Sequence, residues 1–150
     1  LFDIKKLDAI IETKSLIHAM VNFEDGSTTA HIANASMQLP IAYAILGRCD
    51  EEILKPVDLV EVGSLEFKKI ETSRYPIWEA RNDVLNNPDL GVVLNAANEV
   101  AVAKFLKSEI GFLDISKISM DALNKFSNIS VKSIDDIFEI DKEVRIYCES

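Results

Sequence analysis

Two side chains near the start of the chain, Ser15 and His18, could take part in chemistry. His18 is one of only two histidines, and an imidazole at the edge of a ligand pocket can donate or accept a hydrogen bond near neutral pH. The alternative is a structural histidine, whose hydrogen bonds are satisfied within the fold. Residues three apart on a regular strand face opposite sides, so Ser15 shares a pocket with His18 only if the chain bends just before Leu16. The Ser-x-x-His spacing has no convincing third member and does not predict a catalytic triad.

Met37 and His31 are the next candidates along the chain. Met37 opens a predicted helix and either packs in the core or lines a flat aromatic ring, because its side chain is flexible and polarizable. We expect His31, on the predicted return strand, to be exposed to solvent, although it could pair across the strands with His18. Two histidines without a carboxylate cluster do not make a metal site, so the sequence predicts no metal ligand.

The most specific polar run of the chain is Asn-Ala-Ala-Asn-Glu at residues 95–99. Asparagine is unfavourable inside a helix, so we expect local hydrogen bonds to compensate for Asn95 and Asn98. This expectation favours a polar packing joint between domains. Catalysis by Glu99 is the alternative, but no partner for it is visible in the sequence.

The elements that must position these residues change in type near residue 70. Residues 16–23 include the β-branched Ile17 and Val21 and precede Asp25-Gly26, a strong hairpin turn signal, so we predict a strand that returns over 28–33. A short strand is predicted within 9–12. Residues 37–46 predict a helix with Ser36 as its N-cap, ended by Gly47. A polar connector, residues 48–74, holds one strand candidate at 65–69.

From residue 75 onward the apolar period is helical. One helix stops at Asn86-Asn87-Pro88, and the next places Leu94, Ala97, Ala101 and Phe105 on one stripe. A third helix repeats the spacing over residues 115–126, and a near capping box at residues 133–136 opens a fourth. The sequence therefore predicts an α+β protein. Its expected parts are a hairpin and helix (1–47), a polar connector (48–74) and a helical bundle (75–150).

Composition excludes several classes of function. A net charge of −9 disfavours a nucleic-acid partner, which needs clustered Lys and Arg. No apolar run approaches the roughly 20 residues of a membrane-spanning helix, and no basic leader precedes the fold, so we expect a cytoplasmic protein without a membrane partner. The chain has no GxGxxG or P-loop pattern, so no glycine-rich turn is predicted to bind a nucleotide phosphate.

Several segments together carry a family resemblance. In order, they are Ser15-Leu16-Ile17-His18-Ala19-Met20-Val21, Asp25-Gly26-Ser27, Met37-Gln38-Leu39-Pro40, Lys55-Pro56-Val57-Asp58, Gly63-Ser64-Leu65-Glu66, Arg74-Tyr75-Pro76 and Asn95-Ala96-Ala97-Asn98-Glu99. In this order they resemble the C-terminal part of the 1-deoxy-D-xylulose 5-phosphate reductoisomerases of non-mevalonate isoprenoid synthesis. The resemblance implies the last part of the central catalytic domain, a linker and the helical bundle of a homodimeric enzyme.

That resemblance also implies an activity. Family members convert a phosphosugar, 1-deoxy-D-xylulose 5-phosphate, to 2-C-methyl-D-erythritol 4-phosphate with NADPH and a divalent cation (Mg, Mn or Co). Three positions match the family's pocket: Ser15 for substrate binding, His18 as the catalytic histidine and Met37 against the nicotinamide ring. The metal carboxylates, the phosphate ligands and the cofactor domain would precede Leu1, so the fragment alone is expected to be inactive.

The sequence differs from the family pattern in two places. The family usually reads His-Pro-Gln before the serine matched by Ser15, where this chain has Glu12-Thr13-Lys14, so the geometry of this loop is expected to be altered. The family more often has Gln at the position of His31, which suggests that His31 is not catalytic. A second hypothesis, from a different class, is a free-standing α+β scaffold that binds a protein partner through its helical bundle.

Overall fold

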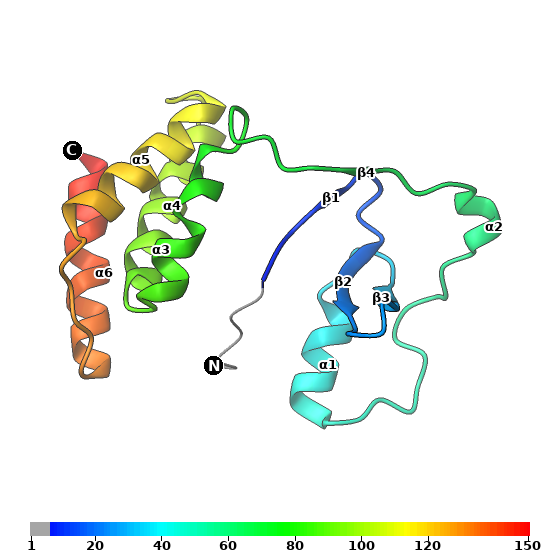
Figure 1. The fold of residues 1–150 in the computed structure, drawn as a ribbon. Helices are drawn as coiled ribbons and strands as arrows, with labels where there is room; N and C mark the ends of the chain where they lie inside the picture. Colours follow the sequence, from blue (N-terminus) through cyan, green and yellow to red (C-terminus); the bar gives the residue numbers. More distant parts are fainter. Residues whose placement is uncertain (1–6) are drawn as a thin grey trace. The chain divides into compact units, whose positions relative to one another are not determined.

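The computed structural model describes residues 7–150, which form a mixed α+β protein of two compact units (Figure 1). Residues 8–69, here called the hairpin unit, carry all the strands found in the described chain. Residues 70–150, here called the helical unit, are helical throughout their regular structure. The α+β class predicted from the sequence is therefore confirmed. No helix of the described residues is both long enough and apolar enough to cross a membrane.

The hairpin unit consists of two small antiparallel sheets and two helices. Its elements are β1 (Ile11–Glu12), β2 (Ile17–Asn22), β3 (Thr28–Ile32), α1 (Gln38–Leu46), α2 (Leu59–Val62) and β4 (Phe67–Lys68). β2 pairs with β3 and β1 pairs with β4. The predicted hairpin turn is present: Gly26 has a φ of +88°, and the Asp25 carboxylate accepts hydrogen bonds from the backbone N–H and hydroxyl of Ser27. Glycine is favoured there because positive φ costs it no steric strain.

The β2–β3 register is irregular at His18. Ile17 lies opposite Ile32, and Ala19 lies opposite His31, so β2 carries one extra residue between these two pairs. That residue is His18, which forms a β-bulge. A bulge re-aims the side chain of the extra residue and bends the strand, so His18 no longer follows the simple face alternation expected from the sequence.

The prediction for the start of α1 is displaced by one residue. Met37, in the right-handed helical region, occupies the N-cap position, whereas the sequence predicted Ser36 there. The Ser36 hydroxyl still accepts a hydrogen bond from the N–H of Gln38 at 3.2 Å. The helix ends as predicted at Gly47, whose φ is +69°. α2 was not predicted; Asp58 caps it by accepting from the N–H groups of Val60 and Glu61.

The connector residues 48–69 belong to the hairpin unit by contact. Asn34 Nδ2 donates to the carbonyl of Lys55 at 3.0 Å, and Lys14 Nζ donates to that of Val62 at 2.6 Å. These contacts bury no residue of the connector, because Ala33 is the only buried residue among residues 8–69. The role of residues 48–74 as a linker stays a prediction.

The helical unit is built around α4. Its elements are a 3-10 helix η1 (Pro76–Ala80), α3 (Arg81–Asn86), α4 (Leu90–Leu106), α5 (Phe112–Lys125) and α6 (Ile134–Glu149). α4 packs against both α5 and α6 (Figure 1). The buried core gathers side chains of these three helices: Leu90, Val93, Ala96, Ala97, Val100, Ala122, Leu123, Val144 and Cys148.

The predicted stripe of α4 is only partly correct. Ala97 and Ala101 are fully buried, but Leu94 is half-buried and Phe105 is 37% exposed. The buried face also includes Ala96, because α4 contacts two helices and therefore buries a wider arc than a single stripe.

Candidate functional site

The hairpin unit contains a cavity of about 330 Å³, within the size range of small-molecule sites. Its lining joins the bulged strand, the end of β3 and the first turns of α1: His18, His31, Ala33, Ser36, Met37, Leu39, Pro40 and Tyr43. Two of the three predicted site residues, His18 and Met37, thus lie on one cavity. None of its eight lining residues is Lys or Arg, so the lining offers no cation for a phosphate.

His18 is held by a backbone hydrogen bond. Its Nε2 lies 3.0 Å from the carbonyl oxygen of Ala33, the single buried residue of this unit. A carbonyl only accepts, so this bond requires the proton on Nε2. In the neutral ring Nδ1 is then the acceptor nitrogen. The imidazole of His31 is 6.2 Å away between ring centroids and tilted by 48°.

Met37 presents an exposed, apolar wall to the cavity. Its side chain is 69% exposed, so the core-packing alternative is not what the described residues show. Pro40 and Tyr43 follow it at helical spacings of three residues and line the same cavity. Their periodicity along α1 was a signal from which both residues could have been added to the site. A flexible thioether beside a proline and an aromatic ring fits the face of a flat heteroaromatic ring.

Ser15 does not line this cavity, although the chain bends where a shared pocket would require it. Residues 13–15 form a turn, and Ser15 has a φ of +56°, one of two non-glycine residues with positive φ in the described chain. Such a conformation is uncommon for serine and persists where surrounding bonds determine it. The bonds come from Glu12, whose carboxylate accepts from the N–H groups of Lys14 and Leu16 at 2.8 and 2.7 Å. No role for Glu12 was predicted.

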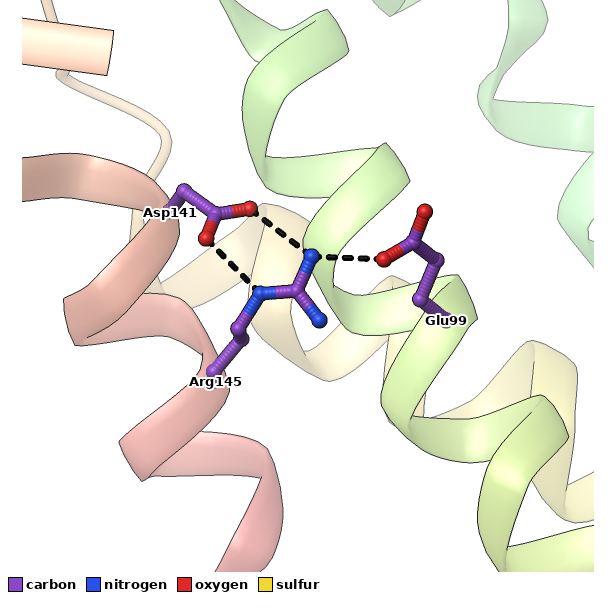
Figure 2. Close-up of polar contacts among 3 residues, drawn as sticks. All are labelled: Glu99, Asp141 and Arg145. Atoms are coloured by element: carbon purple, nitrogen blue, oxygen red, sulfur yellow. Dashed lines mark hydrogen bonds and ion pairs between the residues drawn. The ribbon is translucent and has the colours of Figure 1, made fainter. Parts of the chain in front are cut away.

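The polar run of α4 forms side-chain hydrogen bonds at only one of its three polar positions in the helical unit. Asn95 and Asn98 are exposed, and neither side chain forms a hydrogen bond among the described residues, so the expected local compensation is absent there. Glu99 does have a partner. Arg145 of α6 donates to it at 2.6 Å and forms two bonds to Asp141, a structural link between α4 and α6 (Figure 2).

No metal centre can be assigned within residues 7–150. No group of three or more His, Cys, Asp or Glu side chains in this range is arranged to hold an ion. A separate cavity of about 240 Å³ in the helical unit has Glu79 and Asp83 in its lining, but it contains none of the predicted site residues.

Comparison with known proteins decides the family. The domain family described as the DXP reductoisomerase C-terminal domain matches residues 32–147 of this chain. The chain belongs to the 1-deoxy-D-xylulose 5-phosphate reductoisomerase family. The reductoisomerase of Nautilia profundicola is 57% identical over all 150 residues, and that of Campylobacter fetus is 50% identical over 149. The chain spans only about 41% of the length of either relative.

Solved reductoisomerase structures agree with this family assignment. The enzyme from Zymomonas mobilis, described as a complex with NADPH, has a TM-score of 0.73 and 33% identity over 93% of this chain and 37% of its own. A reductoisomerase described as a complex with magnesium has a TM-score of 0.77 and 27% identity over 93% of this chain and 38% of its own. These likenesses extend through both units of the chain.

Proposed function

We propose that the reductoisomerase containing this chain converts 1-deoxy-D-xylulose 5-phosphate to 2-C-methyl-D-erythritol 4-phosphate in non-mevalonate isoprenoid synthesis. The observation that carries this proposal is the cavity of the hairpin unit, which brings together His18 and Met37. Both residues stand at positions that match the family's pocket in sequence. The relatives' names and the solved complexes with NADPH and magnesium support the same activity and the same cofactors.

We assign the roles in the cavity as follows. Met37 would hold the nicotinamide ring of NADPH, with Pro40 and Tyr43 completing the apolar wall beside it. The bound coenzyme supplies the hydride for the reduction. His18, with its Nε2 proton bound to the Ala33 carbonyl, offers Nδ1 to a substrate hydroxyl and so orders the sugar. Ser15 binds the substrate from the neighbouring turn.

The described residues do not provide a divalent-cation site, so no step through the cation is assigned to them. We propose that its ligands, the phosphate-binding cations and the NADPH domain belong to the part of the reductoisomerase that this chain does not span. By themselves, residues 1–150 are then inactive. NADPH and phosphosugars are metabolites of the cell interior, so we place the reaction in the cytoplasm, catalysed by a homodimer without nucleic-acid or membrane partners.

The full-length protein with His18→Gln tests the assignment of His18. Glutamine can still donate to the Ala33 carbonyl, so the fold is kept, but it lacks the imidazole acceptor. We expect turnover to fall about a hundredfold, as it does when a reactant is misplaced by an ångström. The assay follows NADPH oxidation with the phosphosugar and Mg, Mn or Co.

His31→Gln is the matched control, because it substitutes the other cavity histidine with the residue that the family more often carries. Its turnover should stay close to that of the unsubstituted protein. Unchanged kinetics in His18→Gln would make His18 structural, and an unsubstituted protein that does not oxidise NADPH with the substrate would refute the function itself.

The alternative function is a free-standing α+β scaffold that binds a protein through its helical bundle. The exposed apolar side chains of the hairpin unit argue against independent folding, because a lone two-stranded hairpin is marginally stable in water. The gene distinguishes the two hypotheses. A reading frame that starts with Met just before Leu1 favours the scaffold, whereas a longer frame with a glycine-rich βα turn favours the enzyme.

A further inference from the structure

The turn that carries Ser15 is organised by one side chain, Glu12. Its Oε1 accepts from the N–H of Lys14 at 2.8 Å, and its Oε2 accepts from the N–H of Leu16 at 2.7 Å and of Ile17 at 3.4 Å. These three donors lie on either side of Ser15. The two shorter bonds hold the Thr13–Lys14 and Ser15–Leu16 peptide units, and charged acceptors form the stronger hydrogen bonds. The N–H of Ser15, between them, donates to the backbone carbonyl of Glu12 at 3.4 Å.

Two further hydrogen bonds join the same turn to residues 62–66 of the hairpin unit. The N–H of Thr13 donates to the carbonyl of Glu66 at 3.2 Å, and Lys14 Nζ donates to the carbonyl of Val62 at 2.6 Å. Glu12 itself lies in β1, which pairs with β4. The carboxylate is therefore presented by a paired strand, and the turn closes around it.

The conformation that these bonds impose is one that serine does not adopt readily. Ser15 has a φ of +56°, in the left-handed region. In that conformation the chain bends before Leu16, and β2 then begins at Ile17 with the bulged His18 next to it. Without the carboxylate, the N–H groups of Lys14 and Leu16 lose their acceptor. The turn then keeps its backbone bond from the Ser15 N–H to the Glu12 carbonyl at 3.4 Å, and the left-handed conformation of Ser15 is held less strongly.

We propose that Glu12 is a positioning residue of the reductoisomerase, which holds Ser15 in its substrate-binding conformation through the N–H groups of Lys14 and Leu16. This inference rests on the proposed function, because it gives Glu12 a purpose only if Ser15 binds the phosphosugar. It explains how a chain with Glu12-Thr13-Lys14 in place of the usual His-Pro-Gln keeps a defined geometry around the serine. The backbone N–H of Lys14, followed by that of Leu16, lowers the pKa of Glu12 from its ordinary 4.5, so the acceptor is ionised at neutral pH.

Glu12→Ala and Glu12→Gln in the full-length protein test the inference. Alanine removes both side-chain acceptors, whereas glutamine keeps one carbonyl oxygen of the same reach. We expect the KM for the phosphosugar to rise about tenfold to a hundredfold in Glu12→Ala, as for other groups that orient a binding residue, and less in Glu12→Gln. The KM for NADPH should stay unchanged, because Met37 and the cavity are left intact.

Glu24→Gln is the matched control. Glu24 is an exposed carboxylate in the turn between β2 and β3, its side chain makes no hydrogen bond among the described residues, and its substitution changes the charge equally. We expect both of its KM values to equal those of the unsubstituted protein. A Glu12→Ala protein with the kinetics of Glu24→Gln would overturn the proposal, as would equal losses in the two KM values.

Trypsin provides a readout that does not depend on activity, because the turn contains the bond between Lys14 and Ser15. Cleavage at this bond, measured by mass spectrometry against the other tryptic sites, should accelerate in the order unsubstituted, Glu12→Gln, Glu12→Ala. Unchanged cleavage would show that Glu12 does not hold the turn. If the unsubstituted enzyme fails to turn over the substrate, the proposed function fails, and cleavage still decides whether Glu12 fixes Ser15.

Discussion

Arg145 shows how one side chain can link two helices at the residue scale. Its Nε and Nη2 bind the two carboxylate oxygens of Asp141, one turn earlier on α6, at 2.7 and 3.0 Å. Nη2 also donates to Glu99 of α4 at 2.6 Å, and Figure 2 shows the guanidinium between the two acids. Hydrogen bonds to Asp141 and then to Glu99 raise the pKa of Arg145 above its ordinary value. The planar fork of arginine suits this geometry, which lysine could not reproduce.

Replacing Arg145 by methionine, which keeps an unbranched apolar stem, should lower the free energy of unfolding by about 1 kcal/mol. The cost is modest because the three side chains are about one third to one half exposed and solvent screens their attraction. Urea denaturation of the full chain measures it, and the difference should shrink at high salt. Lys142→Met, on an exposed position of the same helix, is the control and should stay within about 0.5 kcal/mol. Equal effects of the two substitutions would contradict a structural role for Arg145.

At the scale of elements, α6 begins with the capping box that the sequence predicted. The Ser133 hydroxyl accepts from the N–H of Asp136, and the Asp136 carboxylate accepts from the N–H groups of Ser133 and Lys132 at 2.8 and 2.7 Å. These bonds satisfy donors that the first turn of a helix leaves free. The N–H of Lys132, followed by that of Ser133, lowers the pKa of Asp136 from its ordinary 3.8.

This lowered pKa predicts how α6 responds to acid. A carboxyl whose pKa is lower in the folded state stabilises that state at pH values above its ordinary pKa. The stabilisation is lost as the pH falls below 3.8 and through the folded-state pKa. Replacing Asp136 by asparagine should therefore lower the melting temperature at neutral pH and have progressively less effect in acid.

Thermal melts followed by circular dichroism at a series of pH values measure this difference between the two proteins. Asp135→Asn is the control, because Asp135 lies in the same first turn but makes no side-chain hydrogen bond among the described residues. A melting difference that stays constant as the pH falls would show that the Asp136 charge contributes nothing to the cap.

At the scale of the molecule, the two units differ sharply in burial. The helical unit has a core that includes Val93, Val144 and several alanines with no exposed surface. The hairpin unit buries only Ala33, and large apolar side chains such as Val60, Leu46 and Ile45 are at least two-thirds exposed. Because burial of apolar surface is the main force that offsets conformational entropy, the two units should differ in their capacity to fold alone.

Residues 70–150 expressed alone should therefore unfold cooperatively in urea, whereas residues 8–69 expressed alone should show no cooperative transition. Circular dichroism measures the transitions, with the far-ultraviolet signal reporting helix content and the near-ultraviolet signal reporting tertiary packing. Coincident curves from the two probes indicate two-state folding of the helical unit. A cooperative transition of residues 8–69 would contradict the prediction and would favour the free-standing scaffold.

What the sequence determined by itself is the set of elements whose signals are local. The Asp25-Gly26 turn, the Gly47 helix end and the capping box at Ser133 depend on backbone geometry and on side chains within a few residues of one another, so their residue types were sufficient. The α+β order and the family followed from these signals and from the ordered motifs.

Only the tertiary structure decided the features that depend on distant partners. The bulge at His18 results from the pairing of β2 with β3, and the buried arc of α4 depends on the two helices that pack against it. No repeating pattern in the sequence predicts the bonds from Glu12 to the Ser15 turn. The same is true of the bond from Arg145 to Glu99. The candidate cavity joins residues up to 25 positions apart, from His18 to Tyr43, and a contact at that separation exists only after the chain has folded.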